Sequence, residues 1–159
     1  MAPKHYDSLP KQKMSASNTN RPDVINSSEA AEPVGAYPHA RRVGNLLFLS
    51  GIGPRERGRK DIPGVTLAED GSIADYDIEV QTLSVFRNVR AILAAAGTTW
   101  ENIVDVQVFL TNMKQDFPVF NRLYAEHFTH VQATRTTIQI DCLPTPIAVE
   151  LKIIATVPS

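Results

Sequence analysis

The chain is organised around the segment Arg135-Thr-Thr-Ile-Gln-Ile-Asp-Cys-Leu-Pro144 and around Glu150, which lies in the apolar run that follows it. An arginine opens an alternating, β-branched stretch that a Leu-Pro turn closes, which is typical of a β-strand. A guanidinium is a planar, permanently charged group that holds a carboxylate through two parallel hydrogen bonds. Arg135 at a strand end is therefore a candidate anchor for an anionic metabolite.

Glu150 is a lone carboxylate among apolar residues, which costs free energy unless the group is paired or used. Burial raises the pKa of such a carboxyl group and a nearby arginine lowers it, so Glu150 is a candidate for proton transfer. Two structural alternatives to a catalytic role remain open from this segment alone: an ion pair, and a glutamate on the solvent side of an edge strand.

The composition is that of an ordinary soluble domain. The 159 residues are 43% hydrophobic and 21% charged with a formal net charge of −1, so no nucleic-acid or membrane partner is expected. The apolar runs are too short to cross a bilayer and no secretory segment follows the start, which predicts a cytoplasmic protein.

The single cysteine, Cys142, excludes an internal disulfide and is expected to pack as a small apolar group. The four histidines lack a paired ligand spacing, so no metal site is predicted.

Two parts are expected along the chain. Residues 1–30 are polar without a periodic apolar pattern and predict a flexible or loosely docked N-terminal arm, whereas residues 31–159 are expected to form one domain. At the start of the domain, the segment from Arg41 to Gly51 predicts a β-hairpin with a Gly-Asn turn. The Arg- and Gly-rich loop that runs to about Tyr76 is too long for a simple connection, so we expect it at a site rim or a subunit contact.

The periodicity of the rest of the chain predicts an α+β domain. The expected elements are a helix over 78–96, a strand over 103–110, a helix that has Pro118 in its first turn and runs to about 128, and strands over about 136–141 and 147–157. Two helices can cover only one face of the resulting five- or six-stranded mixed sheet. Since two of the strands carry apolar residues on both faces, we expect the uncovered face to pack against further copies in a homo-oligomer.

Several motifs occur in the order found in a known family. They are Pro33-Val-Gly-Ala-Tyr37, Gly44-Asn-Leu-Leu-Phe-Leu-Ser-Gly51, Asn88 followed by Ala96-Gly97, Val104-Asp-Val-Gln-Val-Phe-Leu110, Phe120-Asn-Arg-Leu-Tyr-Ala-Glu-His-Phe128, and Arg135 to Pro144 with Glu150 fifteen residues after the arginine. With these motifs, residues 32–157 resemble the RidA/YjgF-type reactive-intermediate deaminases, which hydrolyse enamines and imines.

The resemblance implies a homotrimer of chorismate-mutase-like subunits with a central β-barrel and a substrate site in each cleft between subunits. In such a site, Arg135 would hold the substrate carboxylate and Glu150 would lie near the attacking water. The resemblance places Tyr37, Asn121 and the strand end Ser50-Gly51 among the substrate-binding residues. Each has a structural alternative: Tyr37 as an interface aromatic, Asn121 as a helix-end hydrogen bonder, and Ser50 as a turn former.

Two departures from the family pattern bear on the substrate. Where many relatives have a cysteine two residues after the arginine, this chain has Thr137, which offers a hydroxyl but no thiol. Where many relatives read Ser-Gly-Gln, it reads Ser50-Gly-Ile-Gly-Pro-Arg55, and a longer basic loop follows. The additional positive charge suits a substrate with a second carboxylate, so Arg55 joins the candidate substrate-binding residues. This variation, with Tyr-Pro-His-Ala-Arg-Arg and Leu-Pro-Thr-Pro, resembles the 2-aminomuconate deaminase subgroup.

The expected function is hydrolysis of an enamine or imine carboxylic acid to ammonia and a 2-oxo acid, with 2-aminomuconate giving 4-oxalocrotonate. No cofactor is expected, because the substrate is already activated. The alternatives are a general 2-aminoacrylate or 2-iminopropanoate deaminase and a non-catalytic, chaperone-like trimer that binds small carboxylates. Chorismate mutase shares the implied fold, but no residue favours that activity. RNA cleavage is disfavoured by the near-neutral charge and the lack of a catalytic histidine pair.

How Arg135 and Glu150 approach each other does not follow from the sequence. If the last two strands formed a simple hairpin, Arg135 would face Glu150 only with a turn between Cys142 and Leu143, whereas the proline-rich loop is centred later. We therefore expect the two residues to meet either diagonally or across subunits.

Overall fold

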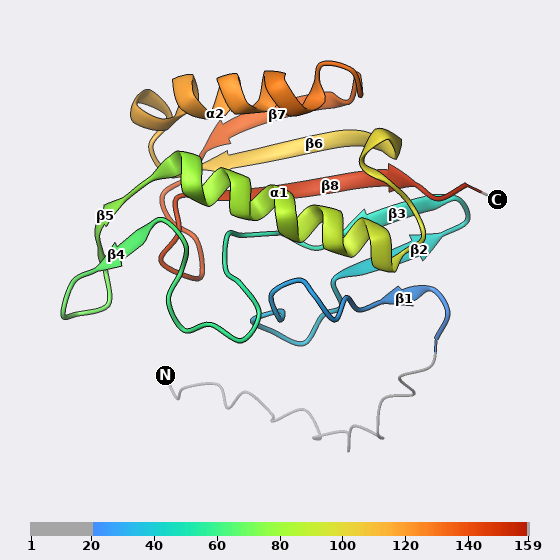
Figure 1. Ribbon diagram of the computed structural model, residues 1–159, viewed down its shortest axis with the longest axis horizontal. Helices are drawn as coiled ribbons and strands as arrows, with labels where there is room; N and C mark the ends of the chain where they lie inside the picture. Colours follow the sequence, from blue (N-terminus) through green and yellow to red (C-terminus); the bar gives the residue numbers. More distant parts are fainter. Residues whose placement is uncertain (1–20, 159) are drawn as a thin grey trace, which may run out of the picture.

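A six-stranded mixed sheet with both helices on one of its faces forms the body of the molecule (Figure 1). The computed structural model describes residues 21–158. The strand order is β1-β2-β3-β8-β6-β7, and β6 and β7 are parallel. The strands are β1 (Val24–Ile25), β2 (Ala40–Val43), β3 (Leu46–Leu49), β6 (Ile103–Leu110), β7 (Thr134–Gln139) and β8 (Val149–Thr156), and β4 (Val65–Leu67) pairs with β5 (Ile73–Tyr76) in a separate hairpin. The predicted α+β class is confirmed.

The predicted hairpin at the start of the domain is also confirmed. Val43 of β2 pairs with Leu46 of β3, which leaves Gly44 and Asn45 as the two-residue turn. Gly44 has a φ of 61°, a left-handed conformation that glycine adopts without steric cost.

Helix α1 (Ile78–Ala95) lies where the periodicity predicts it. The Asp77 side chain caps it by accepting hydrogen bonds from the N–H groups of Glu79 and Val80, at 2.9 and 3.1 Å. Gly97, with a φ of 74°, follows its C-terminus. Its buried apolar face, which packs in the same core as β8, consists of Ile78, Val85, Phe86, Val89, Ile92 and Leu93. No helix within residues 21–158 is both long and apolar enough to cross a membrane.

Helix α2 (Met113–Phe128) begins earlier than predicted, because Pro118 is its sixth residue and so lies in the second turn instead of the first. Asn112 caps the helix by accepting a hydrogen bond from the N–H of Gln115 at 3.2 Å. A proline this close to the N-terminus forgoes a single backbone hydrogen bond, and the burial of Phe120 and Leu123 in the core offsets that loss.

The last two strands do not form a hairpin with each other, because β6 lies between them. Val106 of β6 pairs with Arg135 of β7 on one side and with Ile153 of β8 on the other. The parallel β6–β7 pair requires a crossover, which α2 supplies. Arg135 therefore lies on an edge strand of the sheet, two strands away from the strand that carries Glu150.

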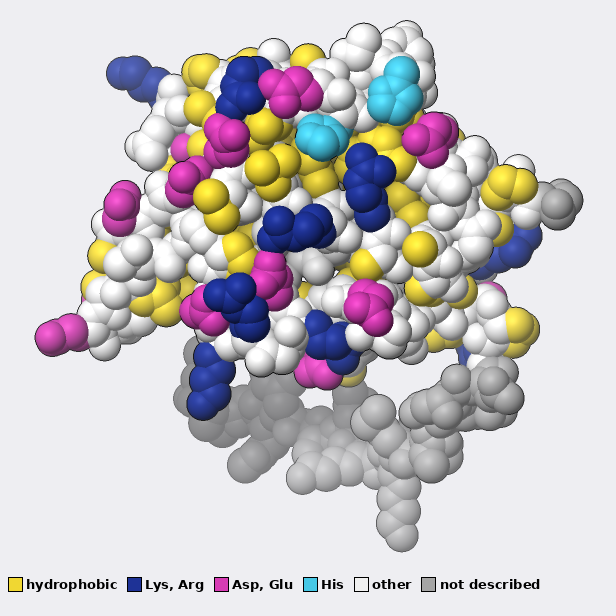
Figure 2. Space-filling view, viewed as in Figure 1, with side chains coloured by type: hydrophobic (Ala, Val, Ile, Leu, Met, Phe, Trp, Pro, Cys, Tyr) yellow, Lys and Arg dark blue, Asp and Glu magenta, His cyan; other side chains and the backbone are white. Residues whose placement is uncertain are grey.

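The two faces of the sheet differ in what covers them, and the side of the molecule that carries the helices presents Lys and Arg side chains interspersed with Asp and Glu (Figure 2). Along β8, Val149, Leu151, Ile153 and Ala155 are buried on the helix side, and the alternate residues face away from the helices. The strand pairings place Val43, Leu46 and Ile138 on this second face, where they are 60%, 37% and 44% exposed. Large apolar side chains on one open face are typical of a surface that packs against another chain.

The N-terminal part of the domain begins earlier than expected. Val24 of β1 pairs with Arg41 of β2, and Ala30 is 1% exposed within the core. Residues 21–30 therefore pack on the domain instead of belonging to a flexible or loosely docked arm over residues 1–30, because a short added strand satisfies the edge of β2. The rest of that expected arm, residues 1–20, lies outside the described residues.

Candidate active site

A cavity of about 130 Å³ lies beyond the end of β3. Its walls come from the segment 27–37, which we call the strap, from the loop after β3, and from the start of β8. Five of the predicted site residues line it: Tyr37, Ser50, Gly51, Arg55 and Glu150. The fold thus brings together residues that are up to 113 positions apart in sequence, as the numbers of Tyr37 and Glu150 show.

Glu150 is the acidic residue of this cavity. It pairs with Phe109 of β6 and projects from the face of the sheet opposite the helices. Burial raises its pKa, and no hydrogen bond or ion pair to its carboxylate is found within residues 21–158. A Cβ atom at Gly51 would lie 2.2 Å from Glu150 Oε1, so only glycine leaves room for the carboxylate in this position.

The Ser50 side chain is fixed by a hydrogen bond, whereas the Tyr37 side chain is largely exposed. Tyr37 is 44% exposed, and its ring packs over Gly35, where a Cβ atom would lie 2.8 Å from it. The Ser50 hydroxyl donates a hydrogen bond to the Pro38 carbonyl at 2.6 Å, and the Ser50 N–H donates to the His39 carbonyl at 2.9 Å. The Ser50 side chain thus helps to hold the end of the strap, whereas the Tyr37 side chain is exposed at the cavity.

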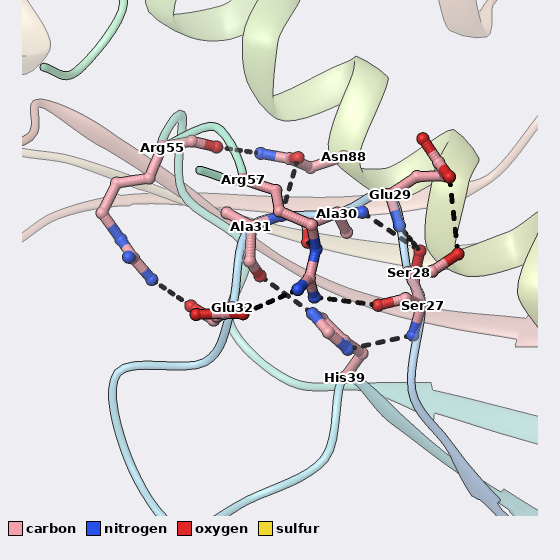
Figure 3. A network of polar contacts seen from close by, with 10 residues as sticks. All are labelled: Ser27, Ser28, Glu29, Ala30, Ala31, Glu32, His39, Arg55, Arg57 and Asn88. Atoms are coloured by element: carbon pink, nitrogen blue, oxygen red, sulfur yellow. Dashed lines mark hydrogen bonds and ion pairs between the residues drawn. The ribbon is translucent and has the colours of Figure 1, made fainter. Parts of the chain in front are cut away.

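Arg57, from the loop after β3, also holds the strap in place (Figure 3). Its guanidinium donates to the carbonyls of Ser27 and Ala30 at 3.0 and 2.9 Å, and to the Glu32 carboxylate at 2.7 Å. Three of the five N–H groups of the guanidinium, one on each nitrogen, are used in these contacts, so Arg57 is a structural residue of the strap.

His39 and Asn88 also hold the strap, and the sequence did not identify them as site residues (Figure 3). His39 Nδ1 accepts from the Ser27 N–H at 3.1 Å and its Nε2 lies 2.8 Å from the Ala31 carbonyl, which requires the tautomer with the proton on Nε2. Asn88 Oδ1 accepts from the Ala31 N–H at 3.3 Å, while its amide group donates to the Gly53 carbonyl at 3.0 Å. Asn88 stands in a family motif and His39 in the segment Tyr-Pro-His-Ala-Arg-Arg, but neither motif indicated a hydrogen bond to the strap.

Arg55 is the basic residue of the long loop that lines the cavity. Its guanidinium donates to the Glu32 backbone carbonyl, a neutral partner, and no carboxylate within residues 21–158 lies within 4 Å of it. Arg59, from the same loop, instead pairs with two carboxylates at the surface. Arg55 therefore keeps positive charge available beside the cavity.

The remaining predicted residues lie together on β7 and α2. Arg135 Nη1 donates to Asn121 Oδ1 at 2.9 Å, and the guanidinium carbon lies 4.5 Å from the centre of the Tyr124 ring and 5.8 Å from that of Phe117. Thr137 is on the same side of β7, and its hydroxyl is buried without a hydrogen-bond partner among residues 21–158. No carboxylate in the described part of the chain lies within 4 Å of Arg135, so its charge is available to an anion.

Arg135 and Glu150 do not meet within one chain. Arg135 is opposite Val106 and Glu150 is opposite Phe109, so they are offset by three residues along the strands and by two strand spacings, about 14 Å between Cα atoms. Because Val106 and Phe109 point to opposite faces of β6, the two side chains also point to opposite faces of the sheet. A small ligand that contacts both residues needs them from different copies of the chain.

A second buried carboxylate, which the sequence did not single out, belongs to Asp116 in the first turns of α2. Asp116 is 0% exposed, and the Tyr76 hydroxyl donates to its two oxygens at 2.9 and 3.1 Å. Burial raises the pKa of Asp116, and burial together with the Asp116 carboxylate raises the pKa of Tyr76. This pair lies at a separate surface cavity between the β4–β5 hairpin and the start of α2.

Comparison with known proteins gives consistent matches. The sequence model of the family described as endoribonuclease L-PSP matches residues 27–157. A RutC family protein of Pyrococcus horikoshii is 33% identical over 133 residues, which cover 84% of this chain and 96% of that protein. A protein of Arabidopsis thaliana named Reactive Intermediate Deaminase A, chloroplastic, is 30% identical over 143 residues, covering 90% of this chain and 70% of that protein. Among solved structures, TdcF of E. coli with bound serine matches with a TM-score of 0.71 and 28% identity, covering 85% of this chain and 98% of that one.

Proposed function

This chain belongs to the endoribonuclease L-PSP family, and we propose that within it the protein is a hydrolytic deaminase of enamine and imine carboxylic acids. The observation that carries the proposal is Glu150, a carboxyl group in a cavity whose pKa is raised by burial. No cation in residues 21–158 lies within 4 Å of it, which argues against a structural ion pair in one chain. The name of the Arabidopsis relative supports the same reaction class.

In the proposed mechanism, Arg135 holds the carboxylate next to the C–N centre of the substrate through two parallel hydrogen bonds. A proton from water adds to the enamine carbon, and the nitrogen returns a proton to the resulting hydroxide, which gives the more electrophilic imine. Glu150 orients a water molecule and, as the base, takes a proton from it while it adds to the imine carbon. Transfer of that proton and then of the remaining O–H proton to nitrogen lets the carbinolamine release ammonia and leave a 2-oxo acid. Positioning supplies most of the rate enhancement, because the imine is already reactive.

We assign the complete site to the contact between copies in a homotrimer with a central β-barrel. Arg135 and Glu150 lie on opposite faces of the sheet within one chain, so a shared ligand requires one residue from each of two copies. The exposed apolar residues on the open face of the sheet, such as Val43 and Ile138, suit contact with the neighbouring copies.

For the substrate we propose a dicarboxylate, with 2-aminomuconate, which would give 4-oxalocrotonate, as the first choice. The support is Arg55, which lines the cavity near Glu150 and has no carboxylate partner in the described part of the chain. One cation would then bind each end of the substrate: Arg135 the reacting end and Arg55 the far end. Tyr37, Asn121 and Thr137 complete the proposed binding residues.

The test of the reaction is ammonia release from freshly generated 2-iminopropanoate and from 2-aminomuconate. Arg135→Lys keeps the charge but loses the planar pair of donors, so kcat/KM is expected to fall by roughly 100-fold or more. Arg122→Lys is the matched control, because Arg122 is an exposed α2 arginine paired with Glu79 and Glu126. A wild-type kcat/KM in Arg135→Lys would remove Arg135 from the mechanism.

Mixing two inactive variants tests the shared site. If each site takes Arg135 from one copy and Glu150 from the next, then refolding Arg135→Lys together with Glu150→Gln restores roughly a quarter of the sites. A mixture that stays inactive, in trimers shown to contain both variants, would contradict the shared site.

The substrate preference is tested with Arg55→Gln. This change is expected to raise KM for the dicarboxylate and to leave KM for the monocarboxylate within about twofold, since only the dicarboxylate has a group for Arg55. Equal effects on both substrates would favour the general deaminase, and no ammonia from either would favour a non-catalytic carboxylate binder. The expected cytoplasmic location stays a prediction, because the name of the Arabidopsis relative places that protein in the chloroplast.

A further inference from the structure

Tyr124 lies between the core and the arginine of the proposed site. It follows Asn121 by three residues on α2, so both side chains point to the same side of the helix, toward β7. One face of its ring stacks on Phe128, with ring centres 4.2 Å apart and planes 6° from parallel. The guanidinium of Arg135, 4.5 Å from the same ring centre, therefore takes the other face.

The ring of Tyr124, and not its hydroxyl, makes these contacts. The hydroxyl is buried and has no hydrogen-bond partner within the described residues. Burying an unpaired hydroxyl costs free energy, so the favourable contribution of this side chain comes from its aromatic face and its size.

Arg135 needs a second constraint besides Asn121. A single hydrogen bond from Nη1 to Asn121 Oδ1 fixes one nitrogen but leaves the plane of the guanidinium free to rotate about that contact. An aromatic face beneath the group removes this rotation, because a cation is attracted to the face of the ring. Two parallel hydrogen bonds to a carboxylate require that plane to be set before the ligand arrives.

The ring is itself held in place by the core. Phe128, which stacks on Tyr124, contacts Phe86 edge to face at 5.7 Å and lies 4.5 Å from the ring centre of Trp100. Phe128 and Trp100 are 2% and 3% exposed. Tyr124 is thus the outer member of a packed aromatic cluster and cannot turn its face away from Arg135 without disturbing that cluster.

We infer that Tyr124 is a positioning residue, whose ring sets the plane of the Arg135 guanidinium for two-point binding of the substrate carboxylate. The inference rests on the proposed function, because it assigns that carboxylate to Arg135. Arg135 holds the carboxylate equally in the bound substrate and in the transition state, so weakening its orientation raises KM more than it lowers kcat.

The test compares Tyr124→Leu with Tyr124→Phe in the full chain, using freshly generated 2-iminopropanoate. Tyr124→Leu removes the aromatic face, and KM is expected to rise roughly fivefold with kcat within about twofold of wild type. Tyr124→Phe keeps the face and loses only the unpaired hydroxyl, so it is expected to keep the wild-type KM. Phe86→Leu is the control for core damage, since it removes a ring from the same cluster at a position that does not contact Arg135.

Three results would overturn the inference: an unchanged KM in Tyr124→Leu, the same rise in Phe86→Leu, or the same rise in Tyr124→Phe. If Tyr124→Leu does not fold, Tyr124→Met fills a similar volume without an aromatic face and has the same expected result. The proposed function is tested separately by Arg135→Lys. A large loss in Arg135→Lys with an unchanged KM in Tyr124→Leu contradicts only the inference, whereas full activity in Arg135→Lys contradicts the proposed function.

Discussion

Glu150 and Asp116 are two carboxylic acids whose pKa values are raised by burial, yet their surroundings differ. Asp116 is fully buried and accepts hydrogen bonds from the Tyr76 hydroxyl through both oxygens. Glu150 is partly exposed in its cavity, has no hydrogen-bond partner within residues 21–158, and lies against a glycine that leaves space for it.

The difference shows why a raised pKa alone does not identify a catalytic group. Burial disfavours the ionised form in both cases. The Asp116 carboxylate is satisfied by a neighbour that fastens α2 to the β4–β5 hairpin, so we assign it to stability. The Glu150 carboxylate keeps its hydrogen-bonding capacity for something outside the chain, which suits a group that orients water.

The largest effect is expected on turnover in Glu150→Gln. The amide has nearly the same shape but cannot act as a base, so ammonia release should fall by roughly 100-fold to 10,000-fold. Stability at neutral pH should not fall, because the change removes a charge that burial disfavours. Asp116→Asn is the matched variant, and it should keep turnover per folded molecule because Tyr76 can still donate to its oxygen. Equal loss of turnover in both variants would contradict the division of roles.

A smaller effect is expected on stability in Tyr76→Phe. Asp116 would keep its burial and lose its hydrogen-bond donor, at a cost of about 1–3 kcal/mol in the free energy of unfolding measured with urea. Tyr124→Phe is the control, because it removes a buried hydroxyl that has no partner within residues 21–158, and its stability should equal or exceed that of wild type. If the two variants lost the same stability, the hydrogen bond to Asp116 would not be the cause.

The smallest effect is a pH dependence of the stability difference between Glu150→Gln and wild type. The folded pKa of Glu150 is raised above its ordinary value of 4.5, so the folded state binds more protons than the unfolded state between the two values. Stability from the protonated group is present below pH 4.5 and is lost as the pH rises through the raised folded value. Wild type should therefore become less stable relative to Glu150→Gln over that window, and the difference should level off above it. Asp116 is present in both proteins, so its titration cancels. A difference that stays constant with pH would show that Glu150 is not desolvated.

Local patterns were sufficient for most of the fold. The alternation over 103–110 gave β6 with its observed bounds, and the turn at Gly44-Asn45 gave the β2–β3 hairpin, whose strands run from Ala40 to Leu49 instead of from Arg41 to Gly51. The three- and four-residue spacing gave α1 to within one residue of its end. The start of α2 and the docked strand β1 were not predicted, because both depend on burial against distant residues that outweighs a local proline or a polar composition.

The sequence singled out some residues of the candidate site and missed the roles of others. Family motifs placed Tyr37, Ser50, Gly51 and Glu150 in one group, and they line one cavity. His39 was visible only as a member of the segment Tyr-Pro-His-Ala-Arg-Arg, and its role could not be predicted because its partners are main-chain groups of the strap. Tyr124 was visible within the motif from Phe120 to Phe128, and its contact with Arg135 depends on how β7 lies against α2.

Residue order along the chain was enough to identify the α+β class, the two helices, and Arg135 and Glu150 as the residues of interest, because periodicity and side-chain chemistry are local properties. The folded chain was needed to place β6 between β7 and β8, and so to put that arginine and that glutamate on opposite faces of the sheet. Strand order follows from which surfaces bury one another, and a crossover helix such as α2 can carry the chain to a neighbouring strand that spacing in the sequence does not specify.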